Sequence, residues 1–164
     1  MLIVWEEKYY TGGYIPVNNY PIWWDSTVTV YNKYEDAQTH VIRWFKTVLS
    51  GCFWKNVGET VNINDVKIDT NNIICRIPKK DNYQSPHLWV ALSNDVKSSY
   101  FTLRQGDIII FGEVDDTIDE YTAGSRSTDI IAKYKALQGC LTIQEVGDNT
   151  GTGRGNEHYR VNGL

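Results

Sequence analysis

The sequence predicts a mainly β protein: a small β-barrel or sandwich with one α-helix in its C-terminal half and an extended N-terminal arm. Several segments alternate apolar and polar residues with the period of a half-buried strand. The six Trp and eleven Tyr among 164 residues suit pleated surfaces and interfaces better than helical bundles. We therefore expect an arm over residues 1–25 and a single β-rich domain over residues 26–164.

The N-terminal arm is predicted by breaker residues that recur among seven large aromatic side chains within residues 1–25. Glycines, prolines and paired asparagines exclude a long helix and leave the segment little capacity to pack alone. Because exposed aromatic surface invites aggregation, we expect a neighbouring subunit or a partner protein to cover the arm, or the arm to fold back over its own barrel. The candidate interface residues are Trp5, Tyr9, Tyr10, Tyr14, Trp23, Trp24 and, outside the arm, Trp89.

The clearest strand begins at Thr27, where Val28 and Val30 fall on one face and Thr27 and Thr29 on the other. The next run, residues 41–49, is apolar on both faces except at three polar positions, which predicts a strand covered on both sides. Those polar positions are Arg43, Lys46 and Thr47.

Later segments continue the strand pattern. The stretch ETVNINDVKI predicts a strand with a bulge or tight turn at Asn64-Asp65. The stretch NNIICRIP predicts a strand that ends at a proline, and a turn at Gly106-Asp107 precedes the apolar run of residues 108–111. The core positions expected from the alternation are Val28, Val30, Ile42, Trp44, Ile73, Ile77, Ile108, Ile110, Leu141 and Ile143.

Residues 79–100 break the strand rhythm and predict a long loop insert, with at most a short hairpin, that holds Trp89 in a polar setting. A helix is expected over residues 128–137, capped by Ser127 or Thr128 and ended by Gly139. Its apolar stripe, which should pack on the sheet chiefly through Ile131 and Tyr134, consists of Ile130, Ile131, Tyr134 and Leu137.

The glycine-rich segment GDNTGTGRGNEHYRVNGL, residues 147–164, raises the question of a phosphate-binding loop. A dinucleotide fingerprint places its glycines between a strand and a helix, and no helical pattern follows here. A phosphate loop also needs Gly-Lys-Ser or Gly-Lys-Thr, which the sequence lacks. We therefore expect two strands, residues 141–146 and 158–161, joined by a polar loop of about ten residues.

The sequence assigns no catalytic, cofactor-binding or metal-binding residue. His40, His87 and His158 fall in three separate segments, none at metal-ligand spacing from another histidine or from a cysteine. Three widely spaced cysteines indicate neither a disulfide framework nor a zinc site. We expect a protein that is not an enzyme and that uses no cofactor; an enzyme would need one of the histidines beside a carboxylate or thiolate in one pocket.

An acidic stretch, EVDDTIDEY, precedes the predicted helix. It lacks the residue order of a calcium-binding loop, so a solvated loop or a patch facing a DNA-containing lumen or a basic partner is the better interpretation. The residues of this expected patch are Asp115, Asp116, Asp119 and Glu120.

The charge and hydropathy of the chain exclude several classes of function. The net charge of −4, with acidic and basic residues mixed, gives no broad attraction to nucleic acid. The N-terminal apolar run is too short for a signal peptide, and no run approaches the length of a membrane span. We expect a soluble protein made in the cytoplasm, with no membrane partner.

Three stretches, STVTVYNKYEDAQTHVIRWFKTVLSGCFW, FTLRQGDIIIFGEV and the closing YKALQGCLTIQEVGDN…EHYRVNGL, resemble structural proteins of tailed phages and prophages of Gram-positive hosts. The resemblance covers roughly residues 26–164. It lies in the order of the strands and in short stretches of similar sequence. Such proteins resemble the head–tail connector group of the phage neck, which includes head-closure proteins. The arm and the insert at residues 79–100 depart from the shorter closure proteins.

The resemblance implies a virion protein of the neck or tail region, made in the host bacterial cytoplasm. It implies a homo-oligomeric ring of six or twelve copies that joins the portal side to the tail, with a portal or adaptor protein and a tail terminator or tail tube protein as neighbours. DNA would pass through the ring without sequence-specific binding. Two alternatives remain: a tail terminator or other protein near the tail tube, and a carbohydrate-binding module that stacks sugars on Trp23, Trp24, Trp54 and Trp89.

Overall fold

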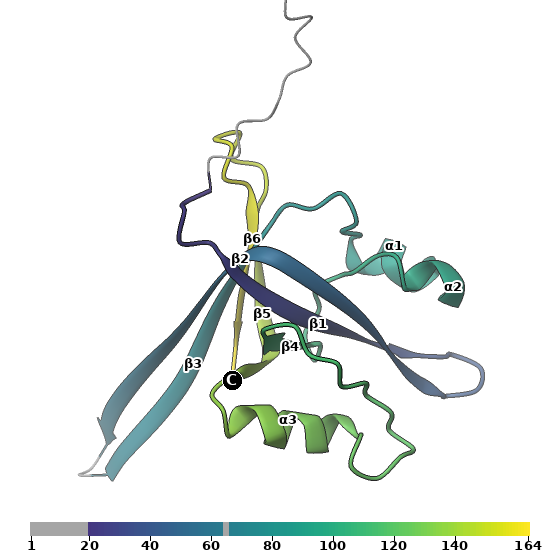
Figure 1. The fold of residues 1–164 in the computed structure, drawn as a ribbon, viewed down its shortest axis with the longest axis horizontal. Coiled ribbons are helices and arrows are strands. Elements are labelled where there is room, and N and C mark those ends of the chain that lie inside the picture. Colours follow the sequence, from purple (N-terminus) through teal and green to yellow (C-terminus); the bar gives the residue numbers. More distant parts are fainter. Residues whose placement is uncertain (1–19, 64–65) are drawn as a thin grey trace, which may run out of the picture.

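The computed structural model of this protein describes residues 20–63 and 66–164. Six strands close into a barrel in the order β1-β2-β3-β6-β5-β4, and every neighbouring pair is antiparallel (Figure 1). The predicted mainly β fold is confirmed, and it is a barrel because β1 pairs with β4 as well as with β2. The strands are β1 (Ser26–Glu35), β2 (Ile42–Ile63), β3 (Val66–Pro78), β4 (Ile108–Phe111), β5 (Cys140–Asn149) and β6 (His158–Gly163).

The barrel interior is a packed core and not a pore, because side chains from all six strands fill it. Eight of the ten predicted core positions are buried, among them Val28, Ile77 and Leu141. The other two, Ile42 and Trp44, are only half-buried because they lie toward the end of the β1–β2 hairpin. The interior cluster contains Val28, Val30, Leu49, Cys52, Ile73, Cys75, Ile77, Phe101, Leu103, Ile109, Leu141, Ile143, Tyr159 and Val161.

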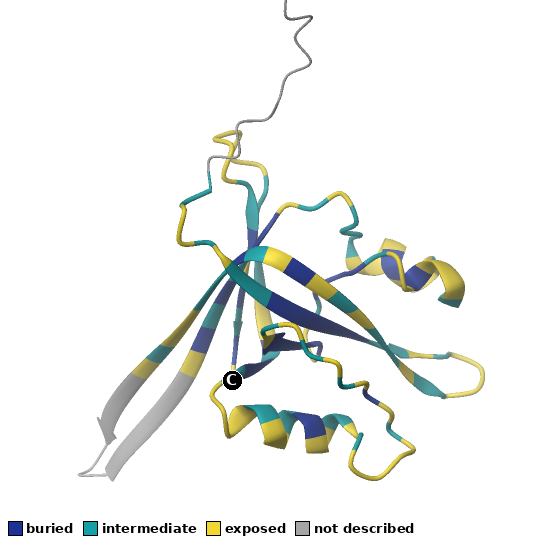
Figure 2. Cartoon of the chain, in the orientation of Figure 1, coloured by how far each residue is buried: buried dark blue, intermediate teal, exposed yellow. Residues whose placement is uncertain are grey.

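Strand β1 is buried on both faces, which corrects the prediction of a half-buried strand (Figure 2). Val28 and Val30 point into the barrel, whereas Thr29 and Tyr31 are covered on the outside by the segment that follows β4. The Thr29 hydroxyl donates to the carbonyl of Gly112 at 2.8 Å and accepts from the amide of Val114 at 3.2 Å. Hydrogen bonds within the chain thus replace the water that a threonine on an exposed face would use.

Helix α3 (Ser127–Lys135) covers this outer face of β1 and β4 and forms a second core with it. Ile130 is its buried residue, and Ile131 and Tyr134 pack beside it, which confirms the predicted contact of these two side chains. The predicted ends of the helix are wrong: Arg126 is the N-cap, and the chain turns at Gln138, whose φ is 53°. Leu137 therefore lies beyond the helix and is exposed.

The insert at residues 79–100 forms two short helices, α1 (Pro86–Ala91) and α2 (Asn94–Lys97), where a loop or hairpin was predicted. Pro86 stands at the first helical position, where its missing N–H costs nothing. Trp89 is fully buried between the insert and β2, with its ring 5.6 Å from that of Phe45. Lys97 Nζ and the Arg104 guanidinium lie 5.6 and 5.3 Å from the centroid of the same ring, so Trp89 is buried but has polar neighbours, as predicted. No helix in the described part of the chain is long and apolar enough to cross a membrane.

Strands β2 and β3 continue beyond the barrel as a two-stranded ribbon. Strand β1 stops pairing with β2 at Cys52, and β6 begins to pair with β3 at Ile73, whereas β2 and β3 remain paired as far as Ile63 and Val66 (Figure 1). The single strand predicted over residues 59–68 is thus two paired strands, and the predicted turn at residues 64–65 lies outside the described residues.

The glycine-rich segment joins two strands, as predicted: β5 and β6 pair from Asn149 and His158 onward, so the connecting loop is residues 150–157. Gly163, near the end of β6, is the glycine that packing requires. A Cβ at this position would lie 2.1 Å from the carbonyl oxygen of Thr142. Any larger residue would therefore force β5 and the chain end apart at this point.

Candidate functional site

The three histidines lie apart from one another, as their spacing predicts. His40 Nδ1 is 3.0 Å from Glu35 Oε1, but both side chains are exposed at the β1–β2 turn. His87 lies beside Ser85 at the start of α1, and His158 lies edge-on to the ring of Trp24. Within the described residues, no group of three or more His, Cys, Asp or Glu side chains could hold a metal ion.

The three cysteines are free thiols, and all are buried. Burial raises the pKa of Cys52 to about 12 and that of Cys140 to about 11. Burial also raises the pKa of Cys75 well above its ordinary value. Because the thiolate is the nucleophilic form, these cysteines are packing residues and poor nucleophiles.

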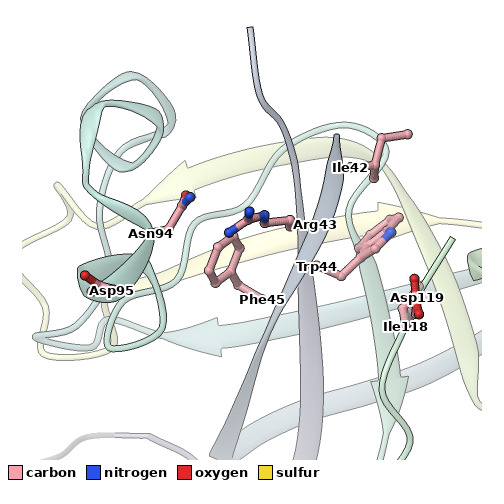
Figure 3. A pocket seen from close by; sticks show the side chains of 8 residues that line it. All are labelled: Ile42, Arg43, Trp44, Phe45, Asn94, Asp95, Ile118 and Asp119. Atoms are coloured by element: carbon pink, nitrogen blue, oxygen red, sulfur yellow. The ribbon is translucent and has the colours of Figure 1, made fainter. Parts of the chain in front are cut away.

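An open pocket of about 400 Å³ lies between the first residues of β2, helix α2 and the segment after β4 (Figure 3). Arg43 and Phe45 point toward Asn94 on one side, while Trp44 lies on the side of Ile118 (Figure 3). The lining contains two carboxylates, Asp95 and Asp119, but no Ser, Thr, Cys, His or Lys. Its lining is Ile42, Arg43, Trp44, Phe45, Asn94, Asp95, Ile118 and Asp119.

A buried polar network, which the sequence did not reveal, ties β1 to the segment before β4. The carboxylate of Asp107 accepts from the amides of Lys33 and Arg104, each at 3.0 Å, and from Asn32 Nδ2 at 2.8 Å. Asn32 in turn bonds both the amide and the carbonyl of Thr102, at 3.2 and 2.7 Å. Burial raises the pKa of Asp107 to about 6, against the opposing effects of its N–H donors and the Arg104 charge.

Lys97 is the buried cation that fixes the insert on the barrel. Its Nζ lies 4.2 Å from the ring centroid of Tyr34 and donates to the carbonyls of Val90 and Leu92 at the end of α1. Burial, followed by the nearby charge of Arg104, lowers the pKa of Lys97. Lys97 and the Asp107 carboxylate thus both have partners within the chain, whereas the buried Arg104 Nε beside them has none among the described residues.

The acidic stretch, residues 113–120, is an extended segment that we call the strap. Its successive side chains alternate between facing the barrel and facing outward. Its even-numbered residues face the barrel and α3: Tyr31 donates to the carbonyl of Asp116 at 2.5 Å, and Lys133 Nζ lies 2.7 Å from Asp116 Oδ2. Glu120 Oε1 accepts from Trp44 Nε1 at 2.8 Å. Asp116 and Glu120 are thus engaged inside the chain, which corrects their assignment to a lumen-facing or partner-facing patch.

The odd-numbered strap residues point outward. Glu113, Asp115 and Asp119 are exposed, and of these Asp119 accepts hydrogen bonds from Tyr121 and Thr122 of its own turn. Asp115 and Asp119 therefore stand where an acidic patch requires them, and Glu113 joins them. The signal for this arrangement was the pair of apolar residues at even positions, Val114 and Ile118.

The tryptophans do not form one aromatic platform among the described residues. Trp23 is exposed, but Trp24 stacks on Tyr20 at 5.3 Å and packs against Phe53. Trp54, the next residue along β2, faces the opposite side of the strand, toward the barrel core. Trp89 is buried, so it is a core residue and not an exposed anchor. The other arm candidates, Trp5, Tyr9, Tyr10 and Tyr14, lie outside the described residues.

The outer face of β3, β6 and β5 carries the second charged surface, which we call the arginine face. Arg76 and Arg160 lie directly opposite each other on β3 and β6, and Gly147 on β5 lies opposite Arg160. Above Gly147 is an open hollow of about 280 Å³, lined by Glu145, Gly147, Asn149, Arg160 and Asn162. Among the described elements, α3 contacts β5, and no helix has comparable contacts with β3 or β6.

These features define a closed antiparallel barrel with a two-stranded ribbon, an acidic strap and an arginine face, and without a recognisable catalytic cluster in its described part. The chain belongs to a family of unknown function, DUF6751, whose model matches residues 23–164. The match begins three residues before β1, so it takes in the whole barrel, the insert and α3. No curated protein and no solved structure matches the chain.

Proposed function

We propose that this protein is a structural component of a tailed-phage neck, a head–tail connector or head-closure subunit that assembles into a ring around the DNA path. The observation that carries the proposal is the β2–β3 ribbon. Beyond the pair of Asn56 and Ile73 its two strands pair only with each other, over a length of roughly 20 Å. An isolated two-stranded hairpin is marginally stable in water, and its open edges bind further strands readily.

A ribbon of this kind suits a subunit that is completed by its neighbours. Among the residues whose burial is described, the fourteen buried residues of the interior come from the barrel strands and the segment before β4. The described histidines lie apart and the buried cysteines are poor nucleophiles, which favours an assembly role over catalysis. A tail terminator remains a second candidate; the scattered tryptophans disfavour a carbohydrate-binding module.

The ribbon is tested by shortening it. Gly58 and Asn71 are paired residues, so Asn-Gly in place of residues 59–70 closes a two-residue hairpin without disturbing the barrel. We expect native mass spectrometry and electron microscopy to show rings for the wild type and monomers for this variant, with equal melting temperatures. A matched control carries Asn-Gly in place of residues 37–40 of the β1–β2 turn and keeps the rings. Rings from the shortened variant, or a monomeric wild type absent from virions, would refute the proposal.

The arm contributes to assembly in the same proposal. Tyr20 and Trp24 are anchored on the barrel, where the Tyr20 hydroxyl donates to the carbonyl of Glu157 at 2.5 Å. Deleting residues 1–19 keeps this anchor, so the deletion variant should keep its melting temperature and lose the ability to join heads to tails in a complementation assay. A collapsed melting temperature would show that the arm serves its own barrel, and normal joining would show that it is dispensable.

A further inference from the structure

The arginine face places two cationic side chains at paired positions of neighbouring strands. Like charges placed directly opposite each other on antiparallel strands destabilise the pair, and Arg76 and Arg160 are such a pair. Neither guanidinium forms an ion pair with a described residue. Glu145, the carboxylate on the same face, is engaged with Asn162 Nδ2 at 3.2 Å.

Both arginine side chains have a partner within the chain, and neither partner is a carboxylate. The guanidinium of Arg76 lies 5.0 Å from the ring centroid of Phe53, and Arg160 Nε donates to Asn162 Oδ1 at 3.3 Å. Gly147 has no side chain to fill the space beside Arg160, which leaves the hollow of about 280 Å³ open. An incoming carboxylate would thus meet Arg160 in the hollow and Arg76 on the neighbouring strand.

The strap offers outward carboxylates on another side of the molecule. Its outward residues Glu113 and Asp115 are two positions apart on an extended segment, which separates them by roughly 7 Å. The cations beside the strap are occupied: Lys133 pairs with Asp116, and Lys46 Nζ lies 3.3 Å from the carbonyls of residues 114 and 115. Glu113 and Asp115 themselves form no ion pair with a described residue.

We infer that the outward carboxylates of the strap of one copy bind the arginine face of a second copy. The inference rests on the proposed assembly role and names its interface. In the barrel order β1-β2-β3-β6-β5-β4, the strap covers β1 and β4, which lie across the barrel from β6 and β3. Two complementary patches on opposite sides of a subunit join copies head to tail, which is the contact that generates a ring when the rotation closes.

Charge exchange tests this interface. The variant Arg76→Glu/Arg160→Glu and the variant Glu113→Arg/Asp115→Arg should each weaken self-association by about tenfold or more at low salt, measured by sedimentation equilibrium. The chain that carries all four changes should regain most of the association, because the signs are exchanged and the geometry is kept. Arg154→Glu, an exposed change in the loop between β5 and β6, serves as the matched control and should have no effect.

Circular dichroism and melting temperatures equal to those of the wild type establish that each variant is folded. Association that is insensitive to the arginine changes would overturn the inference and leave the proposed ring with a different interface. Failure of the variant with all four changes to recover would overturn it as well. A wild type that stays monomeric at all concentrations would count against the ring itself, which distinguishes the two failures.

Nucleic acid is the competing occupant of the arginine face, since phosphates also suit paired guanidinium groups. A fluorescently labelled single-stranded oligonucleotide is the probe. We expect no binding above the level of the Arg154→Glu control. Binding that the wild type shows and Arg76→Glu/Arg160→Glu loses, together with unchanged self-association, would overturn the inference and assign the face to nucleic acid.

Discussion

The two sides of the barrel differ in what their polar groups do. On the side of β1 and β4, the strap and α3 cover the sheet, and buried polar groups such as Thr29 and Asp107 have partners within the chain. On the side of β3 and β6, which we call the bare side because no described helix packs on these strands, Arg76 and Arg160 form no ion pair with a described residue. In the proposed assembly, the bare side gives up some stability for recognition, whereas the covered side provides stability.

The largest loss of stability is expected from disrupting the Asp107 hydrogen-bond network on the covered side. Asp107→Ala removes the acceptor of three N–H groups and leaves them buried beside Arg104, so unfolding in urea should become easier by about 3–5 kcal/mol. The exposed Asp115→Ala should leave the free energy of unfolding unchanged within error. A loss for Asp107→Ala no larger than that of the control would show that the network does not connect β1 to β4.

The titration of Asp107 is expected to change the free energy of unfolding by an amount between the largest and the smallest of the effects predicted here. Because burial raises its pKa from 3.8 to about 6 in the folded protein, the folded state binds the proton more tightly than the unfolded state does. The stability that this group contributes is complete below about pH 4 and is lost as the pH rises through about 6. The wild type should therefore lose roughly 2–3 kcal/mol relative to Asp107→Asn between about pH 4 and pH 7.

The comparison of the two proteins cancels the titration of all other groups, because Asp107→Asn keeps them unchanged. Thermal or urea unfolding at half-unit pH intervals provides the measurement. If the wild type instead gains stability relative to Asp107→Asn as the pH rises, the N–H donors outweigh burial and the folded-state pKa is depressed.

The barrel strands could be predicted from the sequence because their signal is local. Alternation identified Val28, Ile73 and Ile108 as core residues without knowledge of the pairing. Burial of Thr29 could not be predicted, because it depends on Gly112, which is 83 residues away. The same holds for the Asp107 network, whose partner Asn32 lies 75 positions earlier. Helices α1 and α2, of six and four residues, are too short to show a helical period.

The charged surfaces could be predicted only in part. The acidic composition of the strap was evident, and its apolar residues at positions 114 and 118 contained the sign of which carboxylates turn inward. The arginine face was not evident, since Arg76 and Arg160 are 84 positions apart in sequence and meet only through the register of β3 and β6. Register is set by the packing of whole strands, so no local pattern encodes this pair.

The smallest effect is expected on the bare side, and its sign is what distinguishes the two sides. Arg160→Ala relieves the repulsion between Arg76 and Arg160 and removes an exposed side chain, so the isolated subunit should become more stable by about a few tenths of a kcal/mol. High salt screens this repulsion, and the gain should disappear at about 1 M NaCl. Lys79→Ala removes an exposed cation that is paired with Glu157, so it serves as the control and should give no gain. Urea unfolding of dilute protein at low and high salt measures the change in stability of each variant. A clear loss of stability for Arg160→Ala would mean that the arginine face also stabilises the fold.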